Sequence, residues 1–282
     1  YQYRAWASVA IANGQGVTDE QRAALLNSAS HDVERALDLE KNKPQPYWIQ
    51  AIVLSSTGAP ESQVNQAFLR AISMSPKLHE IKDGHFSVVS GLFLQVAKNQ
   101  SQQQAAAGRN SSDLFELQAA MLLWQGQHQE AMEMCLQGLE VHAEDPDLLQ
   151  LQRLIQLDQQ PSSAELQPLE VTAHERFAWQ ASMANAQCFF ARNDSEHEAQ
   201  QLTAAIQVAA SDWQRSLAQI ELARNLVQNG QTSQAVALTY EATASDRAVD
   251  VSRLLTAARD SGANELESLC LKLRSELEPK TQ

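Results

Sequence analysis

The sequence is poor in the residues that interrupt helices, with only ten glycines and eight prolines among its 282 residues. No segment shows the sustained alternation of β-branched and polar residues that is typical of a half-buried strand. Alanine, glutamine, leucine and glutamate, which favour helices, are abundant instead. These features argue against a sheet-based fold and predict an all-α protein.

Cysteine is also scarce, and Cys135, Cys188 and Cys270 are widely separated along the chain. An odd and dispersed set of this kind argues against a disulfide framework. Each cysteine falls inside a predicted helix, so we interpret all three as buried thiols that pack as small apolar side chains. A nucleophilic cysteine would need a cationic neighbour, and the sequence does not place one beside any of them.

Positive charge is in deficit, because 21 lysines and arginines stand against 34 aspartates and glutamates, for a formal net charge of -13. No cluster of basic residues interrupts this pattern. An acidic surface repels nucleic acid and anionic membranes. We therefore expect a protein or peptide partner and no nucleic acid.

Long apolar runs are missing as well, since none reaches the roughly 18 to 20 residues that span a membrane. The longest candidate, residues 86–97, contains Ser87, Ser90 and Gln95. We therefore expect no direct membrane insertion by this chain. The sequence leaves the location unknown, with the cytoplasm, or the periplasm if a signal or an anchor precedes Tyr1, as the alternatives. It does not indicate an oligomeric state.

Motifs for catalysis and cofactor binding are also lacking. His79 and His85 stand on either side of a glycine-containing loop, and His197 lies between two glutamates. Neither arrangement has the helical spacing of a zinc pair, and no phosphate-binding glycine loop or nucleophile elbow occurs. The sequence therefore predicts a protein that is not an enzyme and that has no cofactor and no metal site.

The best-patterned stretch, residues 47–76, is predicted to form two amphipathic helices joined at Gly58. Its apolar residues recur with the three-and-four spacing of a helix face. Residues 57–60 break the pattern, and Pro76 ends the second helix. A single hairpin of this kind cannot bury its apolar face, so neighbouring hairpins have to cover it.

The same periodicity predicts helices along the rest of the chain. They cover residues 1–12, 18–39, 86–104, 113–124, 128–141, 146–157, 172–191, 196–209, 213–228, 232–244, 249–259 and 264–277. An irregular region is expected near residues 77–112, because the apolar pattern loosens after Pro76 and a polar run follows residue 100. A second is expected near residues 158–171, because Pro168 cuts short a further helix over 162–167. We expect one helical repeat domain over residues 1–282, and any subdivision to separate residues 1–108 from residues 112–278.

The turns recur at a nearly constant distance. Gly58 and Gly126 are 68 residues apart, which is twice a period of 34. The next turns follow after 35, 32, 37 and 32 residues, at Pro161, Asn193, Gly230 and Gly262. A tetratricopeptide array has a period of about 34 residues.

Four residues of the hairpin at 47–76, namely Trp48, Phe68, Ala71 and Pro76, have the mutual spacing of the tetratricopeptide repeat. Weaker matches occur around the later turns. The chain thus resembles a divergent, bacterial-type member of the tetratricopeptide-like superfamily of unassigned function. The resemblance implies a right-handed superhelical array of about seven antiparallel helix pairs that acts as a protein-binding scaffold.

In such arrays, ligands lie along the concave surface that is lined by the first helix of each pair. The repeat register places there Ile49, Val53, Ser56, Asp113, Glu116, Ala120, Leu217, Ile220 and Arg224, and Trp124 is a further candidate for peptide contact. These positions are apolar or acidic apart from Arg224, which disfavours the carboxylate clamp of chaperone-binding relatives. An apolar or mixed groove is expected instead.

Two other functions stay open at this point. The chain could be a helical regulatory or dimerisation segment of a longer protein whose catalytic part precedes Tyr1. It could also be an all-α enzyme whose site is assembled from dispersed histidines and carboxylates. That second alternative requires a deep pocket joining several of His79, His85, His128, His142 and Asp145.

Overall fold

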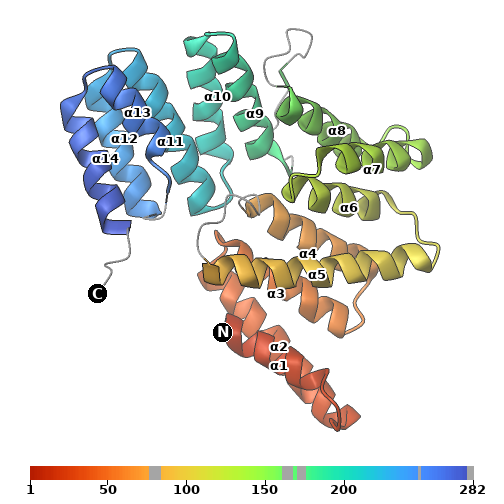
Figure 1. Cartoon of the computed structure of the whole chain (residues 1–282). Coiled ribbons are helices and arrows are strands. Elements are labelled where there is room, and N and C mark those ends of the chain that lie inside the picture. The colour runs from red at the N-terminus through yellow and green to blue at the C-terminus, as the bar shows by residue number, and fades with distance from the viewer. Residues whose placement is uncertain (76–83, 161–167, 170–175, 247–248, 278–282) are drawn as a thin grey trace. The chain divides into compact units, whose positions relative to one another are not determined.

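A computed structural model describes residues 1–75, 84–160, 168–169, 176–246 and 249–277, with no side-chain description for 84–92 and 277 (Figure 1). Over these residues the chain forms fourteen helices and no strand, which confirms the predicted all-α class. The helices are α1 (Gln2–Ala12), α2 (Asp19–Leu39), α3 (Pro44–Ser56), α4 (Glu61–Met74), α5 (Gly84–Ala106), α6 (Ser112–Trp124), α7 (His128–Val141), α8 (Pro146–Gln159), α9 (Ala178–Ala191), α10 (Ser195–Val208), α11 (Asp212–Gln228), α12 (Thr232–Ser245), α13 (Ser252–Asp260) and α14 (Asn264–Leu277). None of the helices described is both long and apolar enough to cross a membrane.

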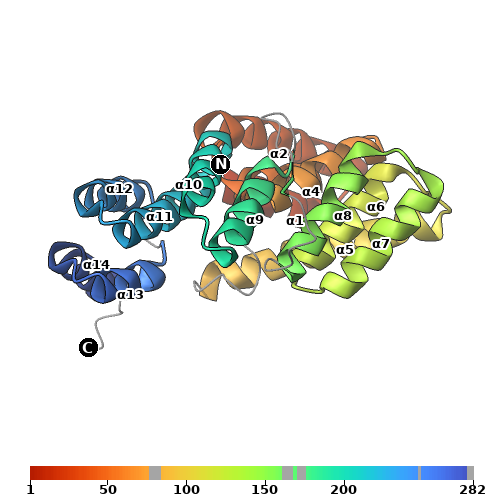
Figure 2. The ribbon, with the colours of Figure 1, turned by 90° about the horizontal axis from the view of Figure 1, so that it is seen from above.

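The chain divides into two compact units, Tyr1–Ile155 and Gln156–Gln282, and α8 spans the boundary between them. Helices that follow one another in sequence pack as pairs within each unit: α1 with α2, α3 with α4 and α6 with α7 in the first, and α9 with α10, α11 with α12 and α13 with α14 in the second (Figures 1 and 2). This pairing is the packing expected of an α-solenoid-like array. The subdivision expected between residues 108 and 112 falls inside the first unit, where α5 packs against α6.

The residues predicted to turn the chain within helix pairs adopt the left-handed backbone conformation. Their φ angles are +71° at Gly58, +76° at Gly126, +56° at Asn193, +77° at Gly230 and +66° at Gly262. A left-handed residue just past a helix ends it and reverses the chain. Asparagine tolerates this conformation better than most other residues with a side chain, which explains its place in the series. The predicted turn at Pro161 lies outside the described residues.

Most predicted helix boundaries agree with the structure within a few residues, and the exceptions have local causes. Helix α3 begins at Pro44 rather than Tyr47, since proline is accepted in the first turn of a helix. Helix α9 begins at Ala178 rather than Thr172, because Arg176 and Phe177 form a turn. Helix α2 begins with a capping box: the Thr18 hydroxyl accepts from the Gln21 backbone N–H, and the Gln21 side chain accepts from the Thr18 backbone N–H.

Trp48 lies at the centre of the first unit's core and is fully buried. Its ring stacks on Phe93 with centroids 5.6 Å apart and packs against Phe68 and Trp124 at 5.8 and 5.6 Å. The indole Nε1–H donates to the Ser75 hydroxyl over 3.3 Å. One side chain thus connects α3, α4, α5 and α6.

The contact between α6, α7 and α8 requires a glycine. A Cβ atom at Gly138 would lie 2.8 Å from the Cβ of Phe115 and 2.9 Å from a methyl carbon of Leu148. Real Cβ atoms do not approach other atoms so closely, so any side chain here would push neighbouring helices apart.

Candidate functional site

Seven of the ten residues predicted to face a partner are buried. They are Ile49, Val53, Glu116, Ala120 and Trp124 in the first unit and Ile220 and Arg224 in the second, each no more than 5% exposed. Side chains that are covered to this extent offer almost no surface to a partner. The faces of α3, α6 and α11 that carry them are packing faces, so the repeat register does not identify accessible residues on these helices.

The three remaining candidates are half-buried and differ in their surroundings. Asp113, in the first turn of α6, accepts a hydrogen bond from the Asn65 amide of α4 over 3.1 Å, which links the two helices. Leu217 packs against the apolar cluster around Trp179 in the second unit. Ser56, at the end of α3, borders an open depression on the first unit. Of the ten predicted residues, Ser56 therefore borders a candidate binding surface.

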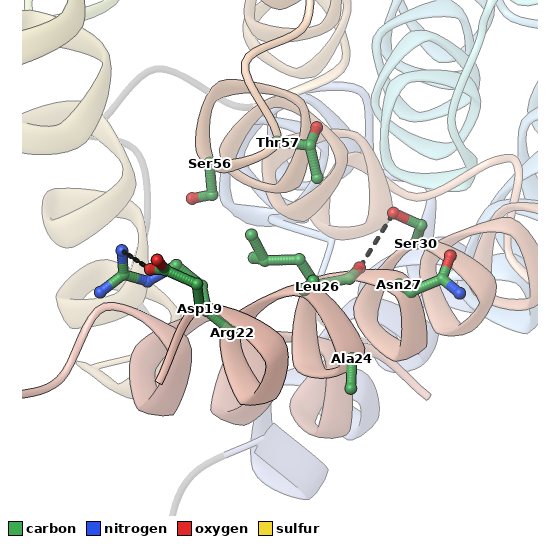
Figure 3. A pocket seen from close by; sticks show the side chains of 9 residues that line it. Asp19, Arg22, Ala24, Leu26, Asn27, Ser30, Ser56 and Thr57 are labelled. Carbon is green, nitrogen blue, oxygen red and sulfur yellow. Dashed lines mark hydrogen bonds and ion pairs between the residues drawn. The ribbon is translucent and has the colours of Figure 1, made fainter. Parts of the chain in front are cut away.

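This depression lies between α2 and the end of α3, two helices that pack together, and has a volume of about 640 Å³ (Figure 3). Figure 3 shows Ser56 and Thr57 on one side and Leu26 extending toward them from α2 on the other. Its lining consists of Asp19, Arg22, Ala23, Ala24, Leu26, Asn27, Ser30, Ser56 and Thr57. The volume suits one or two side chains of a bound peptide, and it is within the usual range of ligand pockets.

Internal contacts engage several of the polar groups in the depression. Arg22 donates from Nε to the Ala12 carbonyl over 3.0 Å, and its guanidinium lies 3.8 Å from Asp19. The hydroxyls of Ser30 and Thr57 each donate to a carbonyl of their own helix over 3.0 Å.

The Asn27 amide and the Ser56 hydroxyl are different, because neither has a hydrogen-bond partner among the described residues. Asn27 is exposed, Ser56 is half-buried, and the buried side chain of Leu26 lies between them on the floor. An amide can donate and accept at once, which matches the alternating donors and acceptors of a peptide backbone. The depression therefore offers neutral hydrogen-bonding groups around an apolar floor.

Arg224, the one cation among the predicted partner-facing residues, is occupied within its own unit. Its Nε donates to Glu221 over 2.8 Å, one terminal nitrogen pairs with Glu198, and the other donates to Gln228 over 3.1 Å. Its guanidinium carbon also lies 4.3 Å from the ring centre of Phe190. Arg224 is therefore unavailable to a partner's carboxylate.

The ion-pair network around Arg224 joins three helices. Glu221 of α11 also accepts from Arg253 of α13 over 2.9 Å, and Glu198 of α10 accepts from Asn225 of α11 over 2.8 Å. Two carboxylates thus balance two guanidinium groups. The sequence contains no signal for this network beyond the residue types, because Glu198 and Arg224 are 26 residues apart.

Asn185 of α9 is a further polar group that the sequence analysis missed. It is fully buried, and its Oδ1 accepts from the Leu169 backbone N–H over 2.8 Å, while its Nδ2 donates to the Leu169 carbonyl over 2.9 Å. The same Nδ2 donates to Gln201 of α10 over 3.2 Å. The sequence does carry a signal here, because Asn185 stands within a largely apolar helix.

The three cysteines are buried free thiols, as predicted. Burial raises the pKa of Cys135 to about 12, with a smaller contribution from the carboxylate of Glu116, and it raises the pKa of Cys270 to about 11. Burial likewise raises the pKa of Cys188. Since the thiolate is the reactive form, these side chains are poor nucleophiles near neutral pH.

Of the histidines with described side chains, His31 and His197 are exposed, and His128 and His142 are half-buried at the two ends of α7. His197 is exposed, stacks on Phe189 and hydrogen-bonds Asp194 over 2.8 Å, and this bond lowers the pKa of the Asp194 carboxyl. His142 contacts the Asn110 carbonyl over 2.6 Å. His79 and the side chain of His85 lie outside the described part of the chain. Within that part, no group of three or more histidines, cysteines or carboxylates could hold a metal ion.

The first unit thus has an open depression as its candidate site, and the second unit has buried polar networks. Neither a protein-family model nor a curated protein matches this sequence.

Proposed function

We propose that this protein is a non-enzymatic scaffold that binds a peptide or protein partner on the surface of its stacked helix pairs. The observation that carries the proposal is the depression between α2 and α3, where the Asn27 amide and the Ser56 hydroxyl flank the apolar floor at Leu26. Neutral donors and acceptors beside an apolar floor suit a peptide segment, and the two charged residues of the lining, Asp19 and Arg22, lie 3.8 Å apart and pair with each other.

We also propose that the helix pairs are tetratricopeptide-type repeats. Support comes from the left-handed turns at Gly58, Gly126, Asn193 and Gly230, whose spacing is close to 34 residues or a multiple of it. Scaffolds of this architecture bind partners along extended surfaces rather than in deep pockets. An experimental structure tests this proposal through the inter-helix angles and the stacking of successive pairs.

A capture experiment tests the binding function. The purified chain is used to isolate partners from its native source, and the bound proteins are identified by mass spectrometry. We expect the double substitution Asn27→Arg and Ser56→Arg to reduce recovery of a specific partner at least tenfold, because two long cationic side chains would fill the depression.

The matched control carries the same change of charge outside the depression, as Ser28→Arg on α2 with Ser62→Arg on α4, both at exposed positions. This control should retain the partner. Equal recovery with both double variants would show that the depression is not the binding surface. Failure of the unmodified chain to enrich any protein would count against the scaffold function itself.

A further inference from the structure

We infer that Leu169 occupies, from within the same chain, a recognition site for extended peptide segments on α9 and α10, so that a partner segment with a large aliphatic side chain competes with it. This inference rests on the proposed scaffold function, because it names a class of partner and the way in which access to it is regulated. The site lies in the second unit and shares no residue with the depression on the first.

The contact between Asn185 and Leu169 is a form of backbone recognition. The side-chain amide accepts from the N–H of Leu169 over 2.8 Å and donates to the C=O of the same residue over 2.9 Å. A residue in an antiparallel strand exchanges the same two bonds with the residue opposite it. The Asn185 side-chain amide thus forms the two backbone hydrogen bonds that a neighbouring strand would form. These bonds favour a segment with an extended backbone and do not depend on the identity of its side chain.

The amide is held in position by its own unit. Gln201 of α10 accepts from Asn185 Nδ2 over 3.2 Å, so one contact that orients the amide does not depend on Leu169. Asn185 is also fully buried, which strengthens its hydrogen bonds and shields them from water. A site held this way pays less ordering cost when it binds another segment.

Selectivity comes from the side chain at the same position. Leu169 is only 8% exposed although it lies outside any helix, so its isobutyl group is enclosed by the protein. The residue bound by Asn185 must carry a backbone N–H, which excludes proline there. Pro168 directly before it is compatible, because the described contacts require no donor from that position.

A second polar group on α9 is buried without a partner among the residues that the structure describes. The hydroxyl of Ser182 is fully buried and makes no hydrogen bond within that part of the chain. Ser182 lies three residues before Asn185, so the two share one face of the helix. Buried hydroxyls are usually paired, and this one provides a further donor and acceptor for a segment that runs along α9.

A peptide competition experiment on the full chain tests the inference. The probe is a fluorescent peptide with the sequence of residues 165–173, and its binding is followed by anisotropy. We expect the variant Leu169→Asp to bind this probe at least ten times more tightly than the unmodified protein, because the internal occupant reduces the fraction of open sites. A probe with aspartate in place of its central leucine should not bind.

Two further substitutions in the Leu169→Asp background identify the site. Asn185→Ala should abolish probe binding, whereas Gln187→Ala, at an exposed position on the same helix, should leave it unchanged. If Leu169→Asp loses its helical circular dichroism, Leu169→Ala replaces it. If neither variant folds, the unmodified protein decides the question, because excess probe must accelerate hydrogen exchange at the Leu169 amide.

Equal affinity of the probe for the open variant and the unmodified protein would overturn the inference. So would absence of binding to a folded open variant, binding that survives Asn185→Ala, or a Leu169 exchange rate that the probe does not change. None of these results touches the capture experiment on Asn27 and Ser56, which concerns the other unit. If the capture experiment failed and the peptide competition experiment succeeded, the inference about the Asn185 site would likewise hold.

Discussion

Helices α3 and α11 are each the first helix of a pair, and each is covered by neighbouring helices, but they are buried through different chemistry. The buried residues of α3 are all apolar: Pro44, Pro46, Trp48, Ile49, Ala51, Ile52 and Val53. Six of the ten buried residues of α11 are polar or charged: Gln214, Ser216, Gln219, Glu221, Arg224 and Asn225. Similar positions in a helix pair can therefore be filled by apolar packing or by paired charges.

This difference determines how each helix responds to substitution. Apolar packing around Trp48 depends on volume and shape, so a smaller aromatic ring preserves most of it. The network around Arg224 depends on complete pairing, because a buried charge that loses its partner retains the full cost of its desolvation. The stability of the protein should therefore be more sensitive to conservative substitutions in α11 than in α3.

The largest effect is expected at Arg224. Replacement by alanine leaves Glu198 without its guanidinium partner and should destabilise the second unit by about 3 to 5 kcal/mol. Arg224→Lys should restore little of this, because an ammonium group cannot replace the three directed contacts of the guanidinium. Chemical denaturation measures the loss of stability. Hydrogen exchange, followed on peptides from each unit, shows in which unit the loss occurs.

The control for Arg224 is Arg215→Ala on the same helix, where the side chain is 42% exposed and pairs with Asp212 over 3.6 Å. Exposed pairs of this kind contribute about 0 to 1 kcal/mol. If Arg224→Ala reduced the stability as little as Arg215→Ala does, the buried network would not stabilise the second unit.

A smaller effect is expected for Trp48→Phe in the first unit. The substitution keeps an aromatic ring against Phe93 but removes the Nε1–H that donates to Ser75, which leaves a buried hydroxyl with one fewer partner. The expected loss is about 1 to 3 kcal/mol, confined to exchange-protected amides of the first unit. Trp48→Ala serves as the reference and should cost more, about 3 to 5 kcal/mol. Equal losses for phenylalanine and alanine would contradict a packing role based on ring shape.

The smallest effect concerns the pH dependence of stability. Asp32 is 3% exposed and is held by Arg4 of α1 through two charge-assisted hydrogen bonds. The bonds from Arg4 lower the pKa of the Asp32 carboxyl more than burial raises it. The stabilisation from this carboxylate is therefore complete above its unfolded pKa of about 3.9 and is lost as the pH falls through the lower folded pKa.

The variant Asp32→Asn tests this dependence, because an amide cannot titrate. We expect the unmodified protein to be the more stable of the two at pH 6, and the difference to narrow as the pH falls below about 4. Urea denaturation across this pH range measures it. A difference that stays constant down to the most acidic pH at which both proteins fold would contradict the assigned role of the Arg4 pair.

The candidate sites were less predictable than the fold. Ser56 was identified from the repeat register, but the other side of its depression, Asn27 on α2, carried no signal in the sequence. Arg224 was placed on the partner-facing surface by the same repeat register. Its actual partners come from α10 and α11, and the packing of those helices determines that it is enclosed. The Leu169 contact escaped prediction because Asn185 is 16 residues away.

What the sequence by itself determined is the local structure: where helices begin, where they end and where the chain reverses. Capping at Thr18, the left-handed turns and the spacing of apolar residues act over a few residues, so they can be recognised in the chain. Only the tertiary structure decided what the side chains on each helix face contact. Whether a polar side chain such as Arg224 or Asn185 meets solvent, a buried counter-charge or a backbone segment depends on residues distant in sequence, and packing alone brings those together.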